Sequence, residues 1–373
     1  MNEETQRKWA EKAINSVEAH LPNPDTIKNW LVCEELLGCA LKCVKSISFY
    51  DVCTEIAASL LNQTAFYLKE LGELAQVEPL LQHSLKIREQ VLGKQSLDYA
   101  QSLNNLAGIY SLEGKHKQAF KLCQESLVIV GQKLGKENLY YAISLNSLAE
   151  ILQKMGEYTQ ALSFFEQALD IFELEKVCGK LSYHYAITLN NIAELYKIDK
   201  QYEKSISLHQ QVLNIKNQLG DKQHPSYAMT LNNIAELYKE SGKYDDAESL
   251  YKQAIDILKI RQEKHWNYAV TLNNLAELYR EQYKYSQALP LLEQASKIME
   301  DGIGKETQYY AFNRSSFAEL YKEQGQYNKA FHLYEQALSI LNRVFNKKHP
   351  IIEKVEINYN ACLKEYHEKI DNE

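Results

Sequence analysis

Apolar residues recur along the chain with the spacing of an amphipathic helix. In one well-marked segment the apolar positions are spaced i, i+3, i+4 and i+7, at Leu103, Leu106, Ala107 and Tyr110. A short turn follows each such helix and leads to a second helix with its own apolar stripe. Residues 247–258 of a later repeat show this second stripe. Glycine, which ends a helix at little conformational cost, stands in many of these turns, as in Gly114. The pattern predicts pairs of helices joined by tight turns.

The helix pair recurs with a period of 41 to 44 residues. Five segments of the form Leu-Asn-(Asn/Ser)-(Leu/Ile)-Ala mark this period, and they end at Ala107, Ala149, Ala193, Ala235 and Ala276. Degenerate copies end at Ala65 and Ala318, and a last echo ends at Ala361. A period of this length indicates a solenoid, in which each repeat buries its apolar face against its neighbours.

This spacing predicts three parts of the chain. Seven tandem repeats are expected over residues 50–350, after an N-terminal helical cap over residues 1–49. Residues 351–373 are expected to form a C-terminal capping helix and tail, because an end repeat must cover its exposed apolar face.

The repeat is similar to the tetratricopeptide repeat in its small-residue positions, its helix–turn–helix length and the aromatic residue after the first-helix alanine. Its length, together with Leu-Asn-Asn-Leu-Ala, Gly-Lys-Tyr and the His-Pro pairs at 224–225 and 349–350, resembles the kinesin light chain subclass. The resemblance covers about residues 50–365. It implies an all-α, right-handed superhelical solenoid of helix–turn–helix repeats, whose concave groove binds protein partners.

Residues 1–58 resemble the helical segment before the repeats of bacterial NB-ARC-type signalling ATPases. The resemblance rests on the segments at 9–13, 21–22 and 33–37 and on Trp30. In those proteins the repeats act as a sensor arm. This chain has no GxxxxGK[ST] loop, so ATP binding is not expected.

Composition and motifs argue against several other functions. A net charge of −7 without dense clusters of lysine and arginine disfavours a nucleic-acid surface, and no apolar run is long enough to cross a membrane. The acidic N-terminus does not resemble a signal peptide, so a cytoplasmic location is expected, with delivery into a host cell as the alternative. The ten histidines and seven cysteines form no metal or catalytic motif. We expect no enzyme activity, no metal site and no cofactor.

Each first helix carries a second stripe, more than 100° away from its apolar stripe. In the family that the chain resembles, this stripe lines the concave groove. Its asparagine row contains Asn104, Asn146, Asn190, Asn232 and Asn273. An amide has donors and an acceptor, so a ladder of asparagines can hold the backbone of an extended peptide. Alternatively, some asparagines bond to the adjacent helix, above all the second of each pair: Asn105, Asn191, Asn233 and Asn274.

Two charged rows follow on the same stripe. The acidic row contains Glu194, Glu236 and Glu277, with Glu150 and Glu319 at equivalent positions. The basic row contains Lys197, Lys239, Arg280 and Lys322. Three residues separate each glutamate from its cation, so the two rows can neutralise each other on a solvated face. Otherwise they select charged residues of the opposite sign in a partner.

The leading functional hypothesis is a protein-interaction scaffold that binds an extended peptide or a partner helix. The alternatives are a regulatory sensor arm of a bacterial signalling or defence system, and a secreted bacterial effector that captures a host protein. For the scaffold, bulky substitutions at Asn190, Asn232 and Asn273 are expected to abolish binding with little change in melting temperature.

Overall fold

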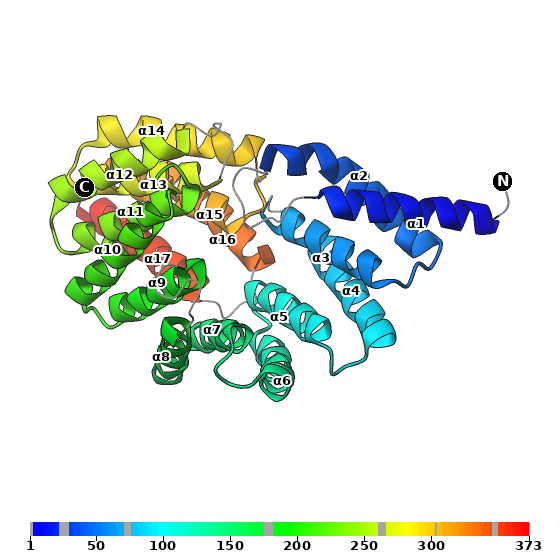
Figure 1. Ribbon diagram of the computed structural model, residues 1–373. Coiled ribbons are helices and arrows are strands. Elements are labelled where there is room, and N and C mark those ends of the chain that lie inside the picture. Colours follow the sequence, from blue (N-terminus) through cyan, green and yellow to red (C-terminus); the bar gives the residue numbers. More distant parts are fainter. Residues whose placement is uncertain are drawn as a thin grey trace. The chain divides into compact units, whose positions relative to one another are not determined.

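The computed structural model describes residues 3–21, 30–70, 76–174, 182–259, 266–302, 304–344 and 350–372. These residues form seventeen α-helices and no β-strand, so the predicted all-α class is confirmed. The chain divides into two compact units, Met1–Gly179 and Lys180–Glu373, which we call unit 1 and unit 2. Figure 1 shows each unit as a series of neighbouring helices.

Unit 1 begins with two helices, α1 (Glu3–His20) and α2 (Trp30–Phe49). Three helix pairs follow, and their members are α3 (Glu55–Glu70), α4 (Val77–Leu92), α5 (Leu97–Leu112), α6 (His116–Leu134), α7 (Leu139–Lys154) and α8 (Tyr158–Leu174). One apolar cluster joins α1 and α2 to the first pair, through buried residues such as Ile14, Ile47 and Leu61. The N-terminal helices therefore cover the first helix pair.

Unit 2 contains four helix pairs and a final helix. The pairs are α9 (Tyr183–Ile198), α10 (Tyr202–Gln218), α11 (Pro225–Glu240), α12 (Tyr244–Lys259), α13 (Trp266–Glu281), α14 (Tyr285–Asp301), α15 (Gln308–Glu323) and α16 (Tyr327–Val344). The final helix is α17 (Pro350–Asn372). Over the described residues the two units thus hold seven successive pairs, α3–α4 to α15–α16.

Most first helices begin at a residue whose side chain accepts a hydrogen bond from the helix N-terminus. Ser96, Asn138 and Ser182 cap α5, α7 and α9 in this way, and His224 and Thr307 cap α11 and α15. Such a cap satisfies one of the free backbone N–H groups of the first turn. The periodic loops thus fix where each repeat starts.

Small residues allow the helices to approach closely. The predicted alanines of the first helices are at most 1% exposed, and those of the second helices are 0% exposed: Ala119, Ala161, Ala247, Ala288 and Ala330. Each first helix packs on its own second helix and on the second helix of the preceding repeat within its unit. Neighbouring first helices also touch each other, as α5 does with α7 and α11 with α13.

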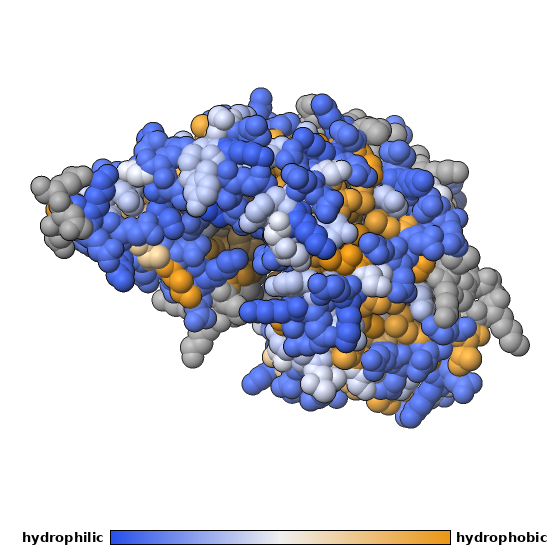
Figure 2. All heavy atoms as spheres, turned by 90° about the vertical axis from the view of Figure 1, so that its left-hand side faces the viewer, coloured by the Kyte–Doolittle hydropathy of each residue, from blue (hydrophilic) through white to orange (hydrophobic). Residues whose placement is uncertain are grey.

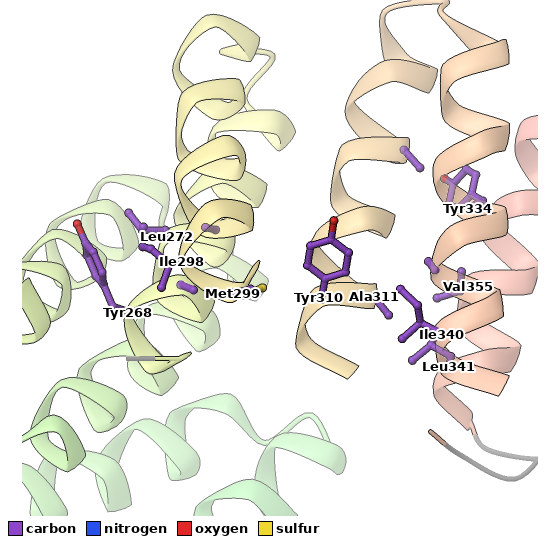
Figure 3. Packing of buried hydrophobic residues seen from close by; sticks show 14 of the residues in the cluster. Tyr268, Leu272, Ile298, Met299, Tyr310, Ala311, Tyr334, Ile340, Leu341 and Val355 are labelled. Atoms are coloured by element: carbon purple, nitrogen blue, oxygen red, sulfur yellow. The ribbon is translucent and has the colours of Figure 1, made fainter. Parts of the chain in front are cut away.

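The largest core cluster of unit 2 extends from α11 to α17. Figure 3 shows part of it, with Tyr268 and Ile298 on α13 and α14, and Tyr334 and Val355 on α16 and α17. Each helix adds a few large side chains to the layer between its neighbours. Figure 2 shows one face of the protein, whose surface is mainly hydrophilic. Hydrophobic residues are exposed there in narrower strips.

The described cysteines include buried and exposed thiols, and Cys39 and Cys53 are exposed. Cys43, Cys123 and Cys362 are buried, and burial raises the pKa of the Cys123 thiol to about 12. Cys178 lies outside the described residues. No group of side chains that could hold a metal ion, and no helix long and apolar enough to cross a bilayer, occurs in the part of the chain that is described.

Candidate protein-interaction face

The first-helix face is the surface of a first helix that carries the asparagine, acidic and basic rows. A row consists of residues at the same distance from the repeat alanine, and successive members lie on neighbouring first helices. Within unit 2, Asn274 on α13 donates to Asn232 Oδ1 on α11 across 3.0 Å. Each row therefore continues from one repeat to the next within a unit.

Part of the asparagine row bonds to the next first helix. Asn104 Nδ2 donates to Ser144 Oγ at 3.1 Å, and Asn273 Nδ2 donates to Ser316 Oγ at 3.0 Å. Asn232 and Asn273 are only 3% and 8% exposed. The inter-helix role that the sequence offered as an alternative thus occurs at members of the first asparagine row.

The other asparagines have different surroundings. Asn146 Nδ2 donates to Glu150 Oε1 on its own helix at 2.7 Å, and Asn190 Oδ1 lies 2.8 Å from His209 Nδ1. Like Asn104, both are half-buried and keep part of their surface open to solvent. Their contact with a ligand stays a prediction.

Three members of the basic row reach a carboxylate of the next repeat, and the fourth, Lys322, reaches Glu365 on α17. Lys197 Nζ lies 2.7 Å from Glu236 Oε2, and Lys239 Nζ lies 3.3 Å from Glu281 Oε1. Arg280 pairs in the same way with Glu323. These ion pairs link successive first helices, a role that the sequence spacing did not predict.

Some of the expected pairs within one helix are also present. Arg280 Nη2 lies 2.9 Å from Glu277 Oε2, and Lys322 Nζ lies 3.0 Å from Glu319 Oε2. Burial alone would lower the pKa of Arg280, but Glu277 and Glu323 outweigh it and raise the pKa. Burial likewise opposes the rise at Lys197, where Glu236 and Glu194 raise the pKa. The basic row is thus charged and bound to protein carboxylates.

Sequence reasoning missed a second row of carboxylates. It lies five residues after the repeat alanine and contains Glu240, Glu281 and Glu323. It also missed an apolar row six residues before the alanine, at Ile143, Ile187, Met229, Val270 and Phe312. Ile187 is 47% exposed. Both rows have the same period as the asparagines, so the repeat alignment itself carried the signal.

A variable core position lies beneath the acidic row, fifteen residues after each glutamate. Phe165, His209, Tyr251, Leu292 and Tyr334 occupy it, and these side chains are buried. The Tyr334 hydroxyl donates to Glu319. His209 Nε2 lies 3.8 Å from Glu194 Oε1. In part of unit 2, polar residues at this core position thus lie close to the glutamates of the acidic row.

The family assignment follows from the chain's similarity to known repeats. The tetratricopeptide repeat family matches residues 55–120, 98–173, 184–260 and 267–343, which together exceed half of the chain. The chain belongs to the tetratricopeptide repeat family. The sequence-based prediction of this repeat is confirmed. The resemblance of residues 1–58 to NB-ARC-type proteins stays a prediction.

Solved structures of similar repeats include proteins related to kinesin light chain. Nearly identical TPR-like repeats of a "putative kinesin light chain" from Podosopora anserina are 23% identical over 54% of this chain and 94% of that chain, with a TM-score of 0.46. BtubC (BKLC) from P. vanneervenii is 20% identical over 62% of this chain and 91% of that chain, with a TM-score of 0.49. No curated protein matches the sequence significantly.

Proposed function

We propose that this tetratricopeptide repeat protein is a scaffold that holds an extended segment of a protein partner along its first-helix faces. Tetratricopeptide repeats generally mediate protein–protein interaction. The main support is the recurrence of the same side chains at the same first-helix positions from repeat to repeat. A linear partner meets equivalent contacts at each step along such a surface. The proposal includes no catalytic step and no cofactor.

The asparagines contribute unequally to this proposal. Asn104, Asn146 and Asn190 are half-buried, so their amides are the ones proposed to contact the partner. Asn232 and Asn273 are buried between helices, and bulky side chains there would disrupt packing, at a cost of about 1–3 kcal/mol. The bulky triple substitution is therefore expected to lower the melting temperature, so lost binding would not identify a contact site.

A photo-crosslinking residue tests the proposal without disturbing the core. We would introduce benzoylphenylalanine in place of Ile187, which is exposed on first helix α9, and in a separate variant in place of Asp256, which is exposed on second helix α12. Irradiation in a cell lysate should link partner proteins at position 187 and not at 256. Equal labelling at both positions, or labelling only at 256, would exclude the first-helix face as the binding surface.

No described feature favours the sensor or the effector hypothesis over the scaffold. A cytoplasmic location and the absence of nucleic-acid binding belong to the same proposal. The carboxylates along α9, α11, α13 and α15 support the absence of nucleic-acid binding, because they repel phosphate groups.

A further inference from the structure

The first-helix face of unit 2 carries more negative than positive charge. On α9, α11, α13 and α15, the three charged rows contain seven carboxylates: Glu194, Glu236, Glu240, Glu277, Glu281, Glu319 and Glu323. They contain four cations: Lys197, Lys239, Arg280 and Lys322. The excess arises from the row five residues after the repeat alanine, which holds glutamate on three of these helices.

Cations of this face are less exposed than the carboxylates that they reach on the next repeat. The Lys239 side chain is 15% exposed, whereas its partner Glu281 is 33% exposed. The Lys197 side chain is 25% exposed, and its partner Glu236 is 35% exposed. In these pairs, solvent and any ligand therefore meet the carboxylate more readily than the cation. Glu240 is exposed, and its charge contributes to the raised pKa of Lys197.

Two buried polar groups, the Tyr251 hydroxyl and His209 Nε2, indicate a ligand at the same face, and the hydroxyl is described first. Tyr251 is 0% exposed, and its hydroxyl has no hydrogen-bond partner among the described residues. In the repeat formed by α15 and α16, the equivalent hydroxyl of Tyr334 donates to Glu319. The carboxylate at the equivalent place near Tyr251 is Glu236, which Lys197 engages instead. An unpaired buried hydroxyl is costly, so its retention calls for a partner.

The surroundings of the Tyr251 hydroxyl are strongly negative. Burial raises the pKa of Tyr251, and the carboxylates on α11 and α13 raise it further: Glu236, Glu281, Glu240 and Glu277. In the preceding repeat, His209 Nε2 also has no hydrogen-bond partner among the described residues, and it lies 3.8 Å from Glu194. A neutral imidazole nitrogen and a phenolic oxygen both accept hydrogen bonds. Groups that bring N–H donors and positive charge satisfy these atoms and the carboxylates together.

An exposed aromatic residue lies at the edge of this face. Tyr283 follows Glu281 by two residues and is 77% exposed. Its backbone is left-handed, with φ of 60°, at a turn position that holds glycine in other repeats. Left-handed backbone is unfavourable for tyrosine, and such strain often marks functional positions. An exposed tyrosine ring two residues after a carboxylate of the row can bind a lysine or arginine side chain through a cation–π contact.

We propose that the first-helix face of unit 2 binds a protein segment rich in lysine and arginine. This inference rests on the proposed scaffold function and specifies the partner's chemistry. The centre of the site is formed by four carboxylates on α11 and α13: Glu236, Glu240, Glu277 and Glu281. The carboxylates are spread along rows, and the described residues include no cluster suited to a metal ion. A row of monovalent side chains therefore fits better than one divalent cation.

Selection from a library of random 12-residue peptides displayed on phage tests this proposal with the full chain. Enriched peptides should contain more lysine and arginine than the starting library. Enrichment of neutral or acidic peptides would overturn the basic-partner inference but support the scaffold function. A selection that enriches no peptide would contradict both.

Charge variants then locate the site. Glu240→Lys combined with Glu281→Gln should weaken binding of a selected basic peptide about tenfold, as measured by fluorescence anisotropy. The reason is that the two substitutions make the net charge of the face three units less negative. The matched control combines Asp256→Lys with Glu293→Gln, at exposed positions on second helices α12 and α14, and should bind normally. Equal weakening in both variants would show a general effect of net charge and overturn the assigned site.

Tyr251→Phe separates the ligand role of the hydroxyl from a structural one. Because the hydroxyl has no hydrogen-bond partner among the described residues, its removal should leave the melting temperature unchanged or raise it. The affinity for the basic peptide should nevertheless fall severalfold. A lower melting temperature with unchanged affinity would remove the hydroxyl from the proposed site.

Discussion

At the scale of the residue, the turn position after each first helix has a measurable conformational preference. Gly114, Gly156 and Gly242 occupy it with φ between 73° and 83°, whereas Lys200 occupies it with φ of 57°. Left-handed backbone costs an L-residue with a side chain about 1–2 kcal/mol. We expect Lys200→Gly to raise the free energy of unfolding by about 1 kcal/mol, measured by urea denaturation.

Two further variants calibrate that result. Gly242→Ala should lower the stability by a similar amount, since a Cβ there meets open space and only the backbone conformation opposes it. Tyr283→Gly should raise the stability as Lys200→Gly does, but it should also weaken binding of the basic peptide. Equal peptide affinities for the two glycine variants would exclude Tyr283 from the proposed site.

Lys216 gives a residue-scale prediction about pH. Its Nζ donates to Ser226 O at 2.7 Å and to Thr230 Oγ1 at 2.9 Å, and burial lowers its pKa from 10.5 to about 8. Between these values the unfolded chain binds a proton that the folded chain has lost. This residue therefore makes stability increase with pH across that window, by at most about 1.4 kcal/mol per pH unit.

The equivalent residues of other repeats indicate the control variant for Lys216. Leu258 and Leu341 occupy the same position, so Lys216→Leu should fit the site. Between pH 8 and 10, the unfolding free energy of the unmodified chain should therefore rise relative to that of Lys216→Leu. A difference that stays constant over this range would show that Lys216 keeps its ordinary pKa in the folded protein.

Individual residues also show where sequence reasoning reaches its limit. The periodicity predicted the asparagine row but not that Asn104 would bond to Ser144, because this contact depends on how two repeats stack. A row of hydroxyl residues five positions before the repeat alanine, which includes Ser102 and Ser144, was the available signal. The side chains that contact a partner are harder to predict, since the same residue types serve packing and binding.

At the scale of the element, ion pairs between successive first helices should contribute to stability. Arg280 and Glu323 have side chains that are 16% and 24% exposed, and Arg280 also pairs with Glu277. A double-mutant cycle with Arg280→Met and Glu323→Gln should give a coupling energy of about 1 kcal/mol, which falls as salt is added. The exposed pair Lys8–Glu4 within α1 is the control, with an expected coupling of about 0.3–0.5 kcal/mol. Equal couplings would mean that the inter-helix pair contributes no more to stability than an ordinary surface pair within one helix.

Helix positions and packing were largely predictable from the sequence because one pattern recurs in every repeat. Small residues such as Ala107 and Ala119 mark close approaches, and the period indicated the paired helices. Departures from the pattern were not interpretable in advance. His209 occupies a core position that holds Phe165 in another repeat. Burial, together with the smaller effects of the positive charges on Lys197 and Lys216, lowers the pKa of His209 to about 4. The sequence spacing gives no sign that this histidine is neutral and buried.

At the scale of the whole molecule, a repeat protein is held together mainly by contacts between neighbouring elements, so its end helices should open most easily. In α1 the only buried residue described is Ile14, whereas α7 buries seven residues, among them Leu145 and Leu148. Opening α1 exposes much less apolar surface than opening α7. Hydrogen exchange followed by mass spectrometry should therefore show faster exchange of backbone amides in α1 than in α7, both of which belong to unit 1. Similar protection of α1 and α7 would show that unit 1 opens as one cooperative body, in which the terminal helix is as firmly held as an inner one.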